Sequence, residues 1–287
     1  MTIRITLQDK STLNETALGA TTLNGGSPML VGWTGTDPQH HVNVAQSADA
    51  HVLSNKATLG ETSIAAPALV SGGGRSYLAW TGTDGAHSLN VMSSPEGRID
   101  YGNKVTLNEQ SKVGPALAFG NGKVFLAWTG TDSRLNVMSS TDGRTFGNKV
   151  TLGETSGAAP SLVFMNGVLY LGWSGTDPNH SLNILQSRDG VHFDQKVTLQ
   201  DSSDFAPVFA PASDNVTYMA WTGRDDKHSL NMMASQDGGR TWGSKVTFAD
   251  TSVAAPSLAW LRDKLIIGWT GTDPQHHCNL AHIVVFM

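Results

Sequence analysis

Short apolar runs alternate with polar turns along the whole chain. In residues 149–195 the pattern predicts strands at 149–152, 159–163, 168–173 and 181–186. The turns between them are rich in Gly, Asn and Asp, and Asn166-Gly167 is a strong signal for a tight hairpin. Alternating runs separated by such turns are typical of β-structure, so the pattern predicts an all-β chain.

The same pattern recurs six times, each copy marked by W-T-G-T-D or a close variant. The six copies begin at Trp33, Trp80, Trp128, Trp173, Trp221 and Trp269, with spacings of 47, 48, 45, 48 and 48 residues. A period of about 47 residues matches one four-stranded propeller blade. The repeat therefore predicts one domain, residues 1–287, folded as a six-bladed β-propeller of four-stranded antiparallel blades.

The two ends of the chain predict how the ring closes. The last unit stops at its third strand, residues 278–286, with no fourth strand after it. At the other end, Ile3-Arg4-Ile5-Thr6-Leu7 resembles the K-V-T-L strand of the other units. We expect the N-terminal strand to complete the final blade, which would leave no open sheet edge there.

Composition narrows the classes of function. Only 15% of residues are charged, the net charge is −5 and no Lys/Arg cluster stands out, so a nucleic-acid partner is not expected. No stretch approaches the roughly 18 apolar residues of a membrane helix, so membrane insertion is not expected either. Cys278 is the only cysteine and no signal peptide is seen, which favours a cytoplasmic or non-classically secreted protein. We expect a monomer without a cofactor.

The turns after the third strands carry a recognisable motif. Residues 140–146 (S-T-D-G-R-T-F) and 235–242 (S-Q-D-G-G-R-T-W) resemble the Asp box, S-x-D-x-G-x-T-W, and residues 187–193, 94–98 and 47–50 are looser copies. At the level of the repeat, the whole chain resembles the sialidase-like, Asp-box family of β-propellers. The resemblance implies that the boxes lie on the face opposite the ligand. Their Asp and Gly suit a tight turn, so we assign them a structural role.

The resemblance to sialidases also implies a catalytic set, namely three arginines, a Tyr–Glu pair and an acid/base Asp. Most arginines fall in segments expected on the Asp-box face or in the closing strand, and only Arg134 and Arg224 remain on the candidate ligand face. The four tyrosines fall within expected strands. The loops of the six units are also nearly alike, whereas an active site occupies one place in a ring. We therefore expect a protein that is not an enzyme, with no catalytic residues.

Polar residues repeat in the loops of the candidate ligand face. The hairpin after each Trp carries Asp, His and Asn at fixed spacing, and the third unit, whose hairpin is shorter, has Arg in place of His. These candidate ligand-binding residues are Asp37, His40, Asn43, Asp84, His87, Asn90, Asp132, Arg134, Asn136, Asp177, His180, Asn183, Asp225, His228, Asn231, Asp273, His276 and Asn279. A second acidic position recurs between blades, at Glu15, Glu61, Glu109, Glu154, Asp201 and Asp250.

These residue types suit a shallow site at each blade junction. Carboxylates and amides pair with vicinal hydroxyls, and Trp or His rings stack on the apolar face of a sugar. Several weak sites can raise apparent affinity by roughly 10²–10⁴-fold. The sequence therefore predicts a non-catalytic, multivalent, lectin-like propeller that binds glycans or glycoconjugates. The alternatives are a sialidase-like glycoside hydrolase with a non-standard site and a protein-interaction scaffold.

A structural explanation of the same residues stays open. The aspartates can cap their own turns, the asparagines can bridge neighbouring blades, and the tryptophans can pack between blades. Histidine is a poor turn former, so for its five copies both explanations remain. Asp-x₂-His could also offer two metal ligands, but zinc sites usually add Cys or a second His and calcium prefers several carboxylates. We expect no metal.

Overall fold

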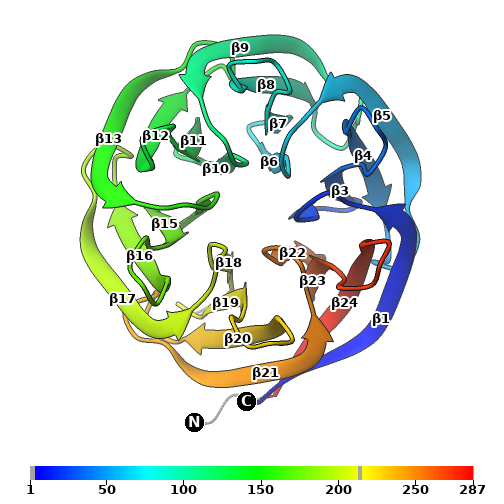
Figure 1. Ribbon diagram of the computed structural model, residues 1–287, viewed down its shortest axis with the longest axis vertical. Coiled ribbons are helices and arrows are strands. Elements are labelled where there is room, and N and C mark those ends of the chain that lie inside the picture. The colour runs from blue at the N-terminus through cyan, green and yellow to red at the C-terminus, as the bar shows by residue number, and fades with distance from the viewer. Residues whose placement is uncertain (1–3, 213–214, 287) are drawn as a thin grey trace.

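Twenty-four strands form a ring of six sheets in the computed structural model, which describes residues 4–212 and 215–286. Each sheet has four strands and the sheets are arranged like blades around a central axis (Figure 1). The predicted all-β, six-bladed propeller is therefore confirmed. Among the described residues, no helix is long and apolar enough to cross a membrane.

The strands take four positions in the blades, from the axis to the rim. The inner strands are β2 (Thr22–Asn24), β6 (Ala68–Gly72), β10 (Ala116–Gly120), β14 (Ser161–Met165), β18 (Val208–Pro211) and β22 (Ser257–Leu261). The second strands are β3 (Met29–Thr34), β7 (Arg75–Thr81), β11 (Lys123–Thr129), β15 (Val168–Ser174), β19 (Thr217–Thr222) and β23 (Lys264–Thr270). The third strands are β4 (His41–Ser47), β8 (Ser88–Pro95), β12 (Arg134–Ser140), β16 (Ser181–Ser187), β20 (Ser229–Ser235) and β24 (His277–Phe286). The outer strands are β5 (Ser54–Thr62), β9 (Gly102–Gln110), β13 (Gly147–Thr155), β17 (Asp194–Ser202), β21 (Gly243–Thr251) and β1 (Arg4–Thr16).

The N-terminal strand closes the ring as predicted, but in a different register. Strand β1 is the outer strand of the sixth blade, in the order β1-β24-β23-β22. Thr12 pairs with Asn279, as Thr58 pairs with Asn43 in the first blade, so residues 10–13 occupy the K-V-T-L position. Residues 4–7, which we expected there, pair with 283–286 and extend the blade beyond the others; Ile3 lies outside the described residues.

Each blade buries its apolar faces against its neighbours. The ring of Trp128, in the third blade, packs in one cluster with Ala68 and Tyr77 of the second blade, and Trp80 packs with Leu30 and Val44 of the first. All six motif tryptophans are about 1% exposed. They are therefore inter-blade packing residues, and their faces are not open platforms for a ligand.

The Asp boxes join neighbouring blades on one face, as the family resemblance implies. In the third blade, Asp142 accepts hydrogen bonds from the N–H groups of Arg144 and Thr145, both at 2.8 Å, and Gly143 takes a left-handed conformation (φ 69°). A Cβ on Gly143 would lie 2.3 Å from the ring of Tyr77 in the second blade, so the turn requires glycine. The backbone of the box in the fifth blade likewise accepts a hydrogen bond from Tyr170 of the fourth.

A bulge interrupts every outer strand at the same place. The residue before the repeated Lys has a left-handed backbone, with φ between 49° and 53°. These residues are Asp9, Asn55, Asn103, Asn148, Gln195 and Ser244. Asn and Asp tolerate this conformation better than other residues with a Cβ, so Gln195 and Ser244 are strained relative to the other copies.

Replacing the strained bulge residues should stabilise the protein. We expect Gln195→Asn and Ser244→Asn each to raise the free energy of unfolding by about 0.5 kcal/mol, because the backbone conformation costs asparagine less. Urea unfolding followed by tryptophan fluorescence measures the change. Asn148→Ser is the matched control and should lower stability by a similar amount; an unchanged midpoint in all three variants would show that the bulge carries no strain.

Candidate functional site

Backbone hydrogen bonds place the predicted site loops on one face. The N–H of Ser63, in the loop between the first and second blades, donates to the carbonyl of His40 in the hairpin between β3 and β4. On the opposite face, the N–H of Glu96, beside an Asp box, donates to Gly74 in the hairpin between β6 and β7. The inter-blade loops and the hairpins after each Trp therefore share one face, here called the junction face.

The repeated aspartates cap the hairpins of the junction face. Asp84 accepts hydrogen bonds from the N–H groups of Ala86 and Ser88 and from the Ser88 hydroxyl, all at 3.0 Å. Partial burial raises the pKa of Asp84, but the hydrogen bonds from Ser88 and Ala86 outweigh it and hold that pKa below its ordinary value. A Cβ on Gly82 would lie 2.6 Å from this carboxylate, which explains the glycine of the motif.

The first threonine of the W-T-G-T-D motif also has a structural role. The hydroxyl of Thr34 donates to the carbonyl of Ala65 at 2.6 Å, and Thr81 donates to Val113 in the same way. Both carbonyls belong to the loop that leads to the next blade. The serine that follows the repeated acid is equally engaged, since the hydroxyl of Ser63 donates to Ala65 and Thr81.

The five histidines of the hairpins have a backbone reason for their position. Each has a left-handed conformation, with φ between 53° and 57°. In the third blade this place is taken by Ser133 (φ 66°), so the expectation that Arg134 stands in place of the histidine was wrong. Histidine is among the residues enriched at such positions. The N–H of His87 donates to Asp84 and its carbonyl accepts from Ser111, so the backbone links the hairpin to the inter-blade loop. The imidazole of His180 is 41% exposed, so its ring can still meet a ligand.

The repeated asparagines are buried inside the blades. Asn90 is 4% exposed; its Nδ2 donates to the carbonyl of Ser88 at 2.8 Å and its Oδ1 accepts from the Thr106 hydroxyl at 2.7 Å. From the sequence, the asparagines are candidate ligand-binding residues, with a bridge between neighbouring blades as the structural alternative. They instead join the third and outer strands of one blade, because Asn90 and Thr106 are paired in the register of β8 and β9.

The acidic residue between blades is the anionic partner in an ion pair that is repeated around the ring. Glu61 of the first blade binds the ammonium of Lys104 of the second at 2.5 Å, and this ammonium lies 5.4 Å from the centre of the Trp80 ring. All six junctions repeat the arrangement, with the pairs Glu15–Lys56, Glu61–Lys104, Glu109–Lys149, Glu154–Lys196, Asp201–Lys245 and Asp250–Lys10. The acids and aspartates predicted from sequence are thus brought to the same junctions, together with a lysine that the prediction missed.

The missed lysine had a signal in the sequence. It opens the K-V-T-L strand of each unit, and at the N-terminus it is Lys10, which the wrong register concealed. The six ammonium groups lie between 5.1 and 5.4 Å from the centres of the six Trp rings. A cation over an aromatic face is a favourable contact, and here it holds each lysine against the Trp of its own blade. The ion pair with the acid of the preceding blade is what links the two blades.

A hollow of about 540 Å³ opens at the junction of the fourth and fifth blades. Asp201 and Ser202 line it from the outer strand of the fourth blade, and Trp221, Arg224 and Lys245 line it from the fifth. Asp225 and Asn231 complete the wall. Carboxylates, cations, an amide and an indole therefore line one cavity at a blade junction.

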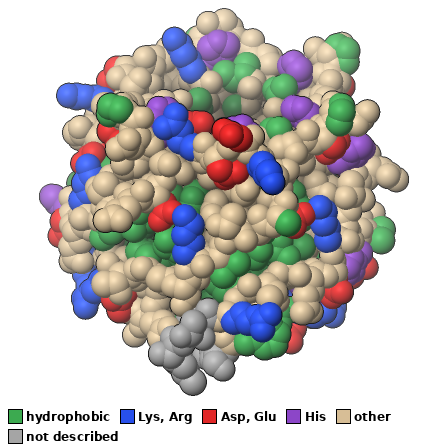
Figure 2. Space-filling view, turned by 60° about the horizontal axis from the view of Figure 1, so that its bottom comes forward, with side chains coloured by type: hydrophobic (Ala, Val, Ile, Leu, Met, Phe, Trp, Pro, Cys, Tyr) green, Lys and Arg blue, Asp and Glu red, His purple; other side chains and the backbone are tan. Residues whose placement is uncertain are grey.

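Small residues line the centre of the junction face. A hollow of about 180 Å³ there is bordered by Ala66-Pro67, Gly114-Pro115, Ala159-Pro160 and Ala255-Pro256. Of the two arginines expected on this face, Arg224 lines the hollow between the fourth and fifth blades, and Arg134 is exposed in the third blade. Charged side chains of both signs are interspersed on the face seen in Figure 2.

Solved structures with a similar fold include a sialidase and a lectin. No model of a protein family matches the chain, and no curated protein matches its sequence. A protein of unknown function from Dyadobacter fermentans is 11% identical, with a TM-score of 0.75 over 98% of this chain and 99% of that one. Hadza microbial sialidase Hz136 is 14% identical, with a TM-score of 0.69 over 93% of this chain and 66% of that one. SapL1 lectin, solved with alpha methyl fucoside, is 13% identical, with a TM-score of 0.67 over 94% of this chain and 96% of that one. Likeness at this identity shows the fold.

Acid should destabilise the protein through its turn aspartates. Their pKa values are lower in the folded chain than the ordinary value of about 3.9, so they stabilise the fold above that pH and lose this contribution as pH falls through the folded-state values. In the Asp box of the fifth blade, burial raises the pKa of Asp237, but hydrogen bonds from Thr241 and Ser235 outweigh it and lower it to about 2. Urea midpoints measured below about pH 4 should fall steeply. In Asp84→Asn, the slope of the free energy of unfolding against pH should fall by the equivalent of up to about one proton. An unchanged slope would contradict the stabilising role given to the Asp84 carboxylate.

Removing a buried asparagine should cost far more stability than changing its neighbouring histidine. We expect Asn90→Ala to lower the free energy of unfolding by about 2–3 kcal/mol, because the Ser88 carbonyl and Thr106 hydroxyl lose their partner. His87→Asn keeps the left-handed backbone and should change it by less than about 0.5 kcal/mol. Chemical denaturation of both variants measures the difference, and equal effects would refute the structural role of Asn90.

Proposed function

We propose that the protein is a non-catalytic, multivalent carbohydrate-binding propeller whose sites lie at the blade junctions of the junction face. The observation that carries the proposal is the sixfold ion pair beside a buried Trp, which at one junction lines an open cavity. The lectin among the solved structures with this fold supports a sugar as the ligand.

The chemistry of the junctions suits neutral polyhydroxylated ligands. At the second blade, Glu61 and Lys104 present acceptors and donors side by side, with exposed fractions of 20% and 39%. Sugar hydroxyls both donate and accept, so one hydroxyl pair can meet both groups. The opposite charges balance, so the junction offers no net attraction for an anion.

The sixfold repetition supports multivalency. One junction buries little ligand surface and should bind weakly, but several junctions on one face can engage a branched or clustered glycan together. The gain in apparent affinity from such linkage is roughly 10²–10⁴-fold.

The proposal includes the absence of catalysis. The small residues at the centre of the junction face support it, because a sialidase-like site would need its charged set gathered in one place. The two arginines of that face belong to the third and fifth blades, so they do not lie on adjacent blades. Hydrolysis of a sialoside and of neutral aryl glycosides by the purified protein would point instead to a glycoside hydrolase.

A glycan array probed with the labelled protein tests the proposal. Binding to a defined class of glycans should fall partially, not completely, in Glu61→Gln/Lys104→Gln, because one of several junctions is removed. The ion pair is exposed and contributes about 1 kcal/mol or less, so this variant should stay folded.

Controls separate the junctions from the rest of the surface. Arg144 lies in an Asp box on the opposite face, so Arg144→Gln should leave glycan binding unchanged. Binding that is lost equally in both variants would contradict junction sites. A folded protein that binds no glycan on the array would overturn the proposed function and favour a protein-interaction scaffold.

A further inference from the structure

Two of the six junctions depart from the repeat. The junction of the second and third blades has Gln110 where four others have a threonine, and the junction of the fourth and fifth blades differs at two further positions. Arg224 stands where the other five copies of the motif have Thr36, Thr83, Thr131, Thr176 and Thr272. In the loop before the fifth blade, Asp204 stands where the other junctions have Leu18, Ile64, Lys112, Gly157 and Val253. Both changes fall at the junction of the fourth and fifth blades.

At four other junctions a pair of threonine hydroxyls bridges the two blades. The threonine at the end of one outer strand is hydrogen-bonded to the second threonine of the W-T-G-T-D motif in the next blade. The distances are 2.6 Å for Thr16–Thr36, 2.5 Å for Thr62–Thr83, 2.6 Å for Thr155–Thr176 and 2.7 Å for Thr251–Thr272. Each of these bridges spans the two walls of its junction.

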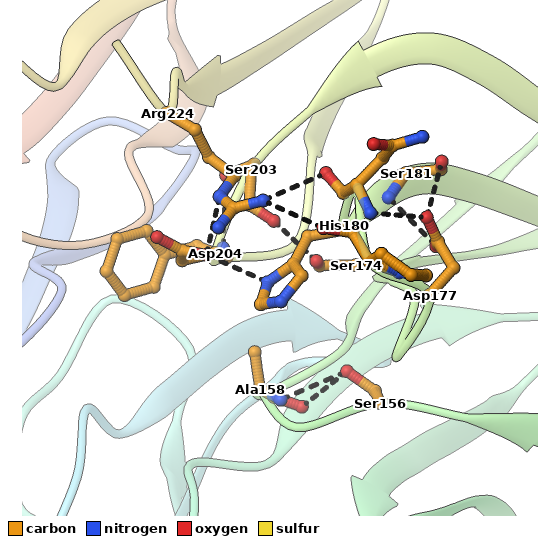
Figure 3. A network of polar contacts seen from close by, with 12 residues as sticks. Ser156, Ala158, Ser174, Asp177, His180, Ser181, Ser203, Asp204 and Arg224 are labelled. Atoms are coloured by element: carbon orange, nitrogen blue, oxygen red, sulfur yellow. Dashed lines mark hydrogen bonds and ion pairs between the residues drawn. The ribbon is translucent and has the colours of Figure 1, made fainter. Parts of the chain in front are cut away.

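The junction of the fourth and fifth blades is held differently. Its outer strand ends at Ser202, and no hydrogen bond joins Ser202 to Arg224 in the described part of the chain. The Arg224 side chain turns away and its Nε lies 3.0 Å from Asp204 Oδ1, while its Nη1 donates to the carbonyl of Asn179 at 3.2 Å. Figure 3 shows Arg224 and His180 both directed at Asp204, with His180 Nδ1 at 2.8 Å.

At this junction the missing bridge accompanies an open cavity lined by an ion pair. A hollow of about 470 Å³ also opens at the bridged junction of the sixth and first blades, but none of the described residues that line it is Lys, Arg, Asp or Glu. Ser202 and Arg224, which would form the bridge, both line the hollow of about 540 Å³. Asp201, Lys245, Arg224 and Asp225 line it, so two carboxylates and two cations face the cavity and their charges cancel. Asp201 is paired with Lys245, and Arg224 is held by Asp204 just outside the lining. A volume of this size falls in the range of about 300–1,000 Å³ that small-molecule sites occupy.

We propose that this junction is a binding site distinct from the others, and that it takes a neutral polyhydroxylated sugar of one or two rings between the Asp201–Lys245 and Asp204–Arg224 pairs. The inference rests on the proposed function and adds that the six junctions are not equivalent. Arg224 is the residue that determines the difference, because it removes the hydroxyl bridge and holds its guanidinium at the rim of the cavity.

Indole NMR of the full chain labelled with ¹⁵N-Trp tests each junction separately. The probes are the methyl glycosides of α-fucose, α-mannose and β-galactose. We expect the Trp221 signal to move and to saturate at a concentration about tenfold lower than the signals of Trp33, Trp80, Trp173 and Trp269. Trp242, in an Asp box on the opposite face, should stay unmoved.

Two variants exchange the features of the junctions. Ser202→Thr/Arg224→Thr introduces the threonine pair of the four bridged junctions and should weaken binding at Trp221 to the level of those junctions. The reciprocal variant, Thr251→Ser/Val253→Asp/Thr272→Arg, copies the open junction to the sixth blade. It should give Trp269 the lower saturation point.

The outcomes separate this inference from the proposed function. Equal saturation at all the junction tryptophans, or unchanged binding at Trp221 in Ser202→Thr/Arg224→Thr, would overturn the distinct site and leave a multivalent lectin. If no glycoside moves any junction signal and the glycan array is also blank, the proposed function fails and this inference fails with it.

Discussion

The fold depends on contacts between blades, because a single four-stranded blade has no other way to cover its two apolar faces. Each motif Trp is about 1% exposed and packs against the preceding blade, and a buried aromatic of this size removes about 150–250 Å² from water. The sixth and first blades can pack together only if the two ends of the chain lie side by side. Strand β1 provides this by serving as the outer strand beside β24.

This constraint explains why the repeat is so regular in the loops of the junction face. The motif places a Thr hydroxyl on the next inter-blade loop, a Gly where a carboxylate approaches, and an Asp that caps the hairpin. These roles serve the joint between blades and would be needed with or without a ligand. The outer part of each junction remains accessible to a ligand, because the Lys–acid pairs there are partly exposed.

Against this background, a departure from the repeat carries more information than the repeat itself. Arg224 and Asp204 interact with each other and with the neighbouring hairpin, so the two substitutions form one structural unit. They replace a hydroxyl bridge found at four junctions and coincide with a cavity. The joint between the fourth and fifth blades thus differs in shape from the four bridged joints.

The sequence by itself determined the number of blades and the strand plan of each unit. It could do so because turn chemistry and strand alternation are local, and six copies reinforce each local signal. Only the tertiary structure decided the rest. Whether Asn90 faces a ligand or the interior depends on its pairing with Thr106, and Lys104 meets Glu61 only when two blades come together. The register of β1 was also beyond the sequence, because two stretches of the N-terminal strand fit the same pattern and the pairing with β24 selects one. Contacts between residues 40 or more positions apart are set by the closed ring, and that is where the candidate site lies.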